Sequence, residues 1–174
     1  MNENFRAIEP KQILDNPFSL IGDDWMLITA GDMEHHNTMT ASWGGVGVLW
    51  NKPVATIYIR PQRHTKPFVD NGEYFTLSVL PNEMREVLTY CGRHSGKDVD
   101  KDKECNLTPF TAVCGNEQSV AYEQARLVLV CRKLYADSIK PECFIDTSLD
   151  EKNYPSKDYH QMYIGEIVRV LEKK

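Results

Sequence analysis

The chain has 174 residues and a formal net charge of −5, and 41% of its residues are hydrophobic while 26% are charged. This length suits one domain with its own core, and an acidic chain without a basic run lacks the clustered Lys and Arg that bind nucleic-acid phosphates. No stretch approaches the roughly 18 apolar residues of a membrane helix, so we expect a single domain over residues 1–174 with neither nucleic acid nor membrane as partner.

Strand signals dominate the sequence. Segments rich in β-branched, aromatic and Leu residues predict strands at Leu27 to Ala30, Val54 to Arg60, Tyr74 to Leu80, Arg126 to Leu134 and Met162 to Leu171. These strands do not alternate with long helices, which disfavours a doubly wound parallel sheet. The pattern favours a closed antiparallel barrel with a few helices packed outside it.

Two short helices are predicted between the strands. One follows Thr65, a good N-cap residue, and ends near Gly72. The other follows Asn82 and runs to Gly92. The charged segment from Gly92 to Lys103 then predicts a long surface loop, and loops of this length are often functional.

The first candidate site is residues 37–45, with the sequence Asn-Thr-Met-Thr-Ala-Ser-Trp-Gly-Gly. Small side chains let a flat ligand approach the backbone closely, and free N–H and C=O groups suit a ring edged with donors and acceptors, such as isoalloxazine. A barrel strand with a glycine bend has the same composition, so both interpretations stay open.

The second candidate site is the segment from Arg60 to Pro67. Thr65 offers a hydroxyl beside the unsatisfied N–H groups of a helix start, where the helix dipole adds partial positive charge. Arg63 precedes it and Arg60 ends the preceding strand, which together predict a site for a phosphate monoester. The alternative is a helix cap beside a solvated basic turn.

The other motifs predict no metal site and no disulfide framework. The five cysteines are scattered without a Cys-x-x-Cys pair, which is typical of reduced, buried thiols. His35 and His36 would point to opposite faces of a strand, and the segment 91–94 is half a metal site without a second half. The polar residues 1–11 are no signal peptide, so we expect a cytoplasmic protein.

Taken in order, these motifs resemble the flavin reductase-like family, most closely its flavoredoxin-type subgroup. The resemblance spans roughly residues 18–171 and rests on the segments 39–43, 63–65, 74–80, 95–101 and 160–167, with Pro53 after the first. It implies a mainly β, antiparallel, Greek-key FMN-binding split β-barrel with a few short helices. It also implies a homodimer with each flavin near the subunit interface.

The resemblance further implies which residues form the site. Non-covalent FMN would be held along its ring by Asn37, Thr38, Met39, Thr40, Ala41, Ser42 and Trp43, at its phosphate by Arg60, Arg63, His64 and Thr65, and near its redox face by Ser95 and Lys101. His160 would be the catalytic residue, although Tyr159 stands where many reductases have Asp. On the charged loop, Lys97 or Lys101 would attract the phosphates of a nicotinamide coenzyme.

The implied activity is that of an NAD(P)H-dependent flavin reductase. NAD(P)H would be a transient co-substrate, and electrons would pass through FMN to a flavin, a ferric complex or a redox protein. Three alternatives remain: an FMN electron carrier reduced by a partner protein, a pyridoxamine-phosphate oxidase-like enzyme, and a non-redox structural domain.

Overall fold

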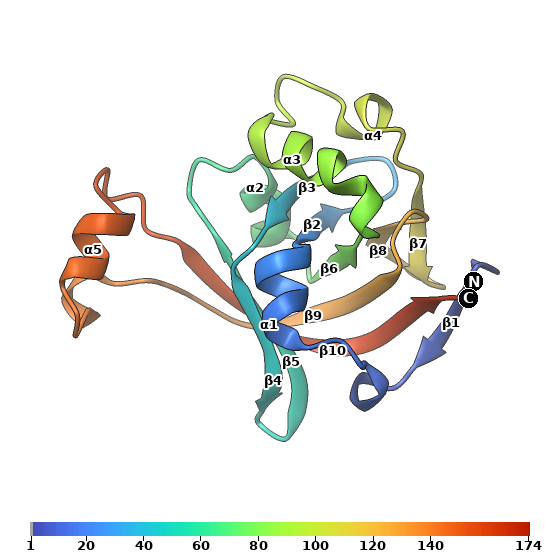
Figure 1. Ribbon diagram of the computed structural model, residues 1–174, viewed down its shortest axis with the longest axis horizontal. Helices are drawn as coiled ribbons and strands as arrows, with labels where there is room; N and C mark the ends of the chain where they lie inside the picture. Colours follow the sequence, from blue (N-terminus) through green and yellow to red (C-terminus); the bar gives the residue numbers. More distant parts are fainter. Residues whose placement is uncertain (1) are drawn as a thin grey trace.

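A large antiparallel sheet forms the centre of the structure, a computed structural model that describes residues 2–174 (Figure 1). Its strands follow the order β3-β2-β6-β9-β10-β5-β4, and β1 pairs with β10 outside this path. They are β1 (Phe5–Ile8), β2 (Met26–Gly31), β3 (His36–Ala41), β4 (Gly44–Leu49), β5 (Lys52–Ile59), β6 (Tyr74–Val79), β9 (Leu127–Ser138) and β10 (Gln161–Lys173). A separate sheet pairs β7 (Pro109–Val113) with β8 (Asn116–Tyr122). The predicted mainly antiparallel β architecture is therefore confirmed.

The two ends of the strand order meet without pairing. β3 and β4 stand at opposite ends of that order, yet only Ser42 and Trp43 separate them in the sequence. The sheet must curl until its ends lie together at these two residues. No strand-to-strand ladder closes the gap in the described residues, so the barrel is not the fully closed one that the strand pattern favoured. It agrees instead with the split barrel that the family resemblance implied.

Side chains alternate between the two faces of the sheet, and buried clusters lie on both faces of its central strands. Ile28 and Leu129 belong to a cluster inside the curled sheet, which also contains Ile57, Phe75 and Tyr163. Their neighbours Leu27 and Val128 belong to a second cluster, which packs against Leu88 and Tyr122. This packing fixes the position of β3 and of the helices beside it.

Short helices connect the strands. They are η1 (Pro10–Gln12), α1 (Pro17–Ser19) continuing into η2 (Leu20–Asp24), α2 (Thr65–Asn71), η3 (Asn82–Met84) continuing into α3 (Arg85–Arg93), α4 (Lys101–Glu104), η4 (Pro141–Cys143) and α5 (Ser148–Asn153). α2 and α3 contact β3, whereas α5 stands away from the barrel at the far end of β9 and β10 (Figure 1). None of the helices in the described part of the chain has the length and apolarity needed to cross a membrane.

All five predicted strands are present, and the two predicted helices are α2 and η3–α3. Thr65 is the first helical residue instead of the N-cap, which is His64. The predicted surface loop is wrong at both ends, because α3 continues to Arg93 and α4 begins at Lys101. The candidate segment 37–45 contains all of β3 except its first residue and the first two residues of β4, with Ser42 and Trp43 between the strands.

The cysteines agree only in part with the prediction of buried thiols. All five are free, and Cys114 and Cys143 are exposed while the other three are buried. Two of the buried thiols lie together, since the sulfur atoms of Cys91 and Cys105 are 3.9 Å apart.

Candidate functional site

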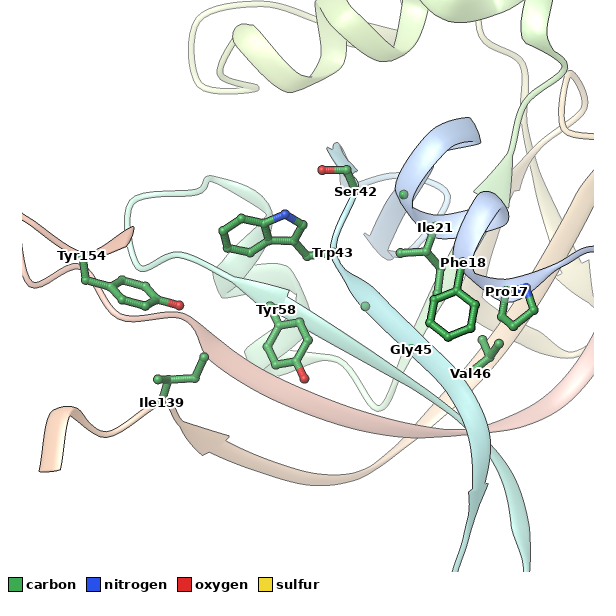
Figure 2. A pocket seen from close by; sticks show the side chains of 12 residues that line it. Pro17, Phe18, Ile21, Ser42, Trp43, Gly45, Val46, Tyr58, Ile139 and Tyr154 are labelled. Atoms are coloured by element: carbon green, nitrogen blue, oxygen red, sulfur yellow. The ribbon is translucent and has the colours of Figure 1, made fainter. Parts of the chain in front are cut away.

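Three adjoining cavities lie along the split in the barrel, between the end of β3 and the start of β4. A cavity of about 390 Å³ lies at the start of α2, and a cavity of about 250 Å³ lies along the end of β3. Both are lined by Met39, Arg60 and Arg63. An apolar pocket of about 580 Å³ continues beyond them and shares Trp43 and Tyr58 with the second cavity (Figure 2). We call these three cavities together the groove.

Two arginines mark one end of the groove. Arg60 donates to the Asp158 carboxylate and, over 2.9 Å, to the carbonyl of Asn153. Arg63 donates over 2.7 Å to the carbonyl of Gly92 and is half-buried. Burial and the charge of Arg60 lower the pKa of Arg63 from its ordinary value. The charge of Arg63 is therefore poorly compensated, and an anion placed here would stabilise it.

The same end holds a polar cradle at the start of α2. Thr65 is buried, and its hydroxyl accepts a 2.7 Å hydrogen bond from the side-chain amide of Asn37. The buried Nδ1 of His64 has no hydrogen-bond partner in the described part of the chain. A buried ring nitrogen left unpaired costs free energy, so this cradle suits a ligand with hydrogen-bonding oxygens.

The Ser95–Gly96 turn closes the cradle from above β3. A Cβ atom on Gly96 would lie only 1.8 Å from Oδ1 of Asn37, so any larger residue at position 96 would displace the Asn37 side chain. Ser95 and Gly96 both line the cavity that holds the two arginines.

Lys101 is not the free surface cation that the charged loop predicted. Only 6% of the residue is exposed, and its Nζ donates to the carbonyls of Thr38, at 2.7 Å, and Cys91, at 2.8 Å. Burial lowers the pKa of Lys101. Lys101 therefore ties β3 to α3 and only borders the groove, so it cannot move to meet a coenzyme phosphate.

Aromatic rings gather where the groove becomes apolar. Half of Trp43 is exposed, and its ring centroid lies 5.3 Å from that of His160. Figure 2 shows Trp43, Tyr58 and Tyr154 along one part of the apolar pocket, with Phe18 and Ile21 from the α1–η2 segment on its other side. These faces form walls suited to a flat apolar ligand.

His160 is a neutral imidazole in this setting. It is buried, its Nδ1 lies 2.8 Å from the hydroxyl of Tyr154, and the ring of Tyr58 stands edge-on to it. Burial and the charge of Arg60 lower the pKa of His160 to about 4. At neutral pH it therefore has no second ring proton to give, and it contributes a flat, neutral wall rather than an acid.

The structure brings nearly all of the predicted site residues to the groove. Those that line its two smaller cavities are Asn37, Met39, Thr40, Ala41, Ser42, Trp43, Arg60, Arg63, His64, Thr65, Ser95, Lys101 and His160. Thr38 is different, because its side chain is buried beside β2 with its hydroxyl oxygen 3.0 Å from that of Thr29. Only its backbone carbonyl takes part, through Lys101.

Sequence reasoning missed several lining residues. Tyr58 had a usable signal, since it lies two residues before Arg60 in the predicted strand Val54 to Arg60, where such residues share a face, and both line the same cavity. Phe18, Ile139 and Tyr154 had none, because they come from the α1–η2 segment and the β9–β10 arm, far away in the sequence.

The family described as "Flavin reductase like domain" matches residues 19–174. The FMN-binding domain of a flavin reductases-like enzyme from Shewanella baltica OS155 superposes with a TM-score of 0.67 at 16% identity, over 98% of this chain and 78% of that chain. Flavoredoxin from Methanosarcina acetivorans gives 0.66 at 18% identity, over 87% and 69%. The FMN-binding protein from Thermus thermophilus with bound p-hydroxybenzaldehyde gives 0.66 at 20% identity, over 97% and 82%.

These likenesses show that the curled antiparallel sheet is the split-barrel fold of FMN-binding proteins. A comparison with curated protein sequences found no match.

Proposed function

The chain belongs to the flavin reductase-like domain family, and from that premise we propose that it binds FMN non-covalently in the groove and acts as an NAD(P)H-dependent flavin reductase. The observation that carries the proposal is a single groove with a cationic cradle at one end and a flat, open strand edge at the other. FMN has the same two parts, a phosphate and a planar ring.

The cradle fits the phosphate. Arg63 and Arg60 supply positive charge, Thr65 supplies a hydroxyl, and the unpaired Nδ1 of His64 supplies a further polar partner. A phosphate dianion here would offset the mutual repulsion of the two arginines.

The edge of β3 fits the ring. β3 ends the strand order, so the backbone groups on its outer side pair with no strand among residues 2–174. An unpaired strand edge presents a row of N–H donors and C=O acceptors, and Met39 to Ser42 line the second cavity. The donors and acceptors on the edge of the flavin ring match such a row.

When bound, FMN supplies the hydride and electron transfer, and the chain supplies binding, orientation and exclusion of water. Arg63 and Thr65 anchor the phosphate end, while β3 orients the ring. Trp43 and the neutral His160 form an apolar wall that limits water, and the neighbouring apolar pocket leaves space for a second planar molecule.

The reductase activity is tested by mixing FMN-loaded protein with NADH or NADPH under anaerobic conditions. We expect either coenzyme to bleach the flavin absorbance within minutes, and steady-state turnover with a flavin or ferric acceptor to follow a ping-pong pattern. If dithionite bleaches the flavin and neither coenzyme does, the protein is an electron carrier reduced by a partner protein.

We also propose that the protein is a homodimer. Large apolar side chains are exposed on and beside the β4–β5 hairpin: Val48 at 77%, Trp50 at 54% and Tyr135 at 43%. Such exposure is typical of association surfaces, and two-fold dimers are the commonest oligomers. Light scattering at micromolar concentration should return twice the 20.0 kDa of one chain. A mass of one chain would contradict the proposal.

A further inference from the structure

Both ring nitrogens of His36 face acceptors. Its Nδ1 lies 2.9 Å from the carbonyl oxygen of Asp32, and its Nε2 lies 2.8 Å from Oδ2 of Asp102. A carbonyl oxygen cannot donate a hydrogen bond, and neither can an ionised carboxylate. A neutral imidazole carries one N–H, so both contacts are hydrogen bonds only when His36 is an imidazolium.

Asp102 has a second side-chain partner. The hydroxyl of Tyr122 donates to Oδ1 of Asp102 over 2.9 Å, while Oδ2 of the same carboxylate faces Nε2 of His36. Burial, followed by the charge of Asp102, raises the pKa of Tyr122 well above its ordinary value, so this hydroxyl remains a donor. The three side chains therefore form one network from β8 through α4 to the first residue of β3.

This network anchors the segment 95–105 to the strand that lines the groove. Asp102 and Lys101 are neighbours on α4, and they reach β3 at His36 and at the carbonyl of Thr38, respectively. Within segment 95–105, Gly96 lies close against the side chain of Asn37. Ser95 and Lys101 of this segment line the cationic cavity. Segment 95–105 is therefore held to β3 at two places, His36 and the carbonyl of Thr38, and we call this segment the cover of the cradle.

We propose that His36, as an imidazolium, is a positioning residue that holds segment 95–105 over the cationic end of the groove, and that its deprotonation loosens this cover. The anchoring itself follows from the contacts of the free protein. Its effect on a bound ligand rests on the proposed FMN site.

The direction of the pH dependence follows from the charges around the ring. The titratable groups that face His36 are Asp102 from α4, Asp32 from the β2–β3 turn and Tyr122 from β8. The cavity beside it is also lined by Glu34, His35, Lys97, Asp98, Asp100 and Lys101. Burial lowers the pKa of His36, but the hydrogen bond and charge of Asp102, followed by those of Asp32, outweigh it and raise the pKa above 6.5.

Because the pKa of His36 is raised in the folded protein, the imidazolium holds segment 95–105 in place at low pH. This stabilisation is complete below the unfolded-state pKa of about 6.5 and is lost as the pH rises through the higher folded-state value. We therefore expect the cover to be held under mildly acidic conditions and to loosen at mildly alkaline pH.

The first test uses the protein without FMN. Nitrogen-15 NMR of the histidine rings at about pH 6 should show His36 with two N–H groups. The signals of His36 are assigned by their loss in His36→Gln.

Hydrogen exchange of the backbone amides of residues 95–105 is measured on the same FMN-free protein. After correction for intrinsic base catalysis, exchange should accelerate with rising pH in the wild type and in His35→Gln, a variant of the exposed neighbouring histidine. The acceleration should be absent in His36→Gln. A single-tautomer spectrum at that pH, or an unchanged acceleration in His36→Gln, would overturn the proposal.

The second test measures FMN affinity across the same pH range. We expect a loss of about 2- to 10-fold between mildly acidic and mildly alkaline pH that His35→Gln keeps and His36→Gln lacks, since one hydrogen bond is at stake. Titration of the FMN phosphate is common to all three proteins and cancels in the comparison. If FMN binds with the same pH profile in all three, the inference fails and the proposed function stands. If FMN does not bind while the exchange response appears, the proposed function fails and the anchoring role stands.

Discussion

Replacing Arg63 with Ala is expected to weaken FMN binding by about 10- to 150-fold while changing riboflavin binding little. The side chain lines both of the smaller cavities. Its positive charge is poorly compensated, because it is partly buried and lies near the like charge of Arg60. Losing a charge-assisted hydrogen bond to a phosphate costs about 1.5–3 kcal/mol. Riboflavin lacks the phosphate, so it reports only on the ring end of the groove.

The comparison is made by titrating each flavin against the apo protein and following the quenching of flavin fluorescence. Arg6→Ala is the matched control, because Arg6 forms an exposed ion pair with Glu172 on the far strands of the sheet. Equal weakening of FMN and riboflavin by Arg63→Ala would show that Arg63 does not bind the phosphate and that the bond to Gly92 only maintains the fold.

Replacing Lys101 with Ala is expected to lower the free energy of unfolding by about 2–4 kcal/mol, even without FMN. The substitution leaves the carbonyls of Thr38 and Cys91 without their shared donor in a buried site. Lys97→Ala is the matched control on the same segment, because Lys97 is exposed and surface substitutions usually change stability by about 0.5 kcal/mol or less.

Urea denaturation of the two variants beside the wild type measures the difference. If Lys101→Ala and Lys97→Ala unfold at the same urea concentration, the two hydrogen bonds of Lys101 contribute nothing to stability. Lys101 would then act as an ordinary loop lysine, as its charged sequence context predicts.

The strands with strong local patterns could be predicted, and those defined by tertiary pairing could not. Residues 56–60 alternate clearly and lie almost entirely within β5, because one face of that strand packs in the core. β3 and β4 are rich in small, polar or glycine residues with weak strand preference. Their pairing with β2 and β5 makes them strands, and that pairing has no local signal.

The same distinction applies to the site. Arg60, Arg63 and Thr65 could be placed together because a strand end and a helix start lie close in the sequence. Local rules failed where a distant partner determined the side chain's role. Thr65 was expected to cap α2, but its hydroxyl accepts from Asn37. Lys101 was expected on the surface, but it is buried because two carbonyls from separate elements converge on it.

Each functional proposal for this protein requires that the groove binds FMN. The most direct measurement is the visible spectrum of the purified protein after incubation with FMN and gel filtration. We predict a yellow protein with flavin absorbance bands that elute with the protein. A folded protein that stays colourless after the same treatment would show that the groove does not bind FMN.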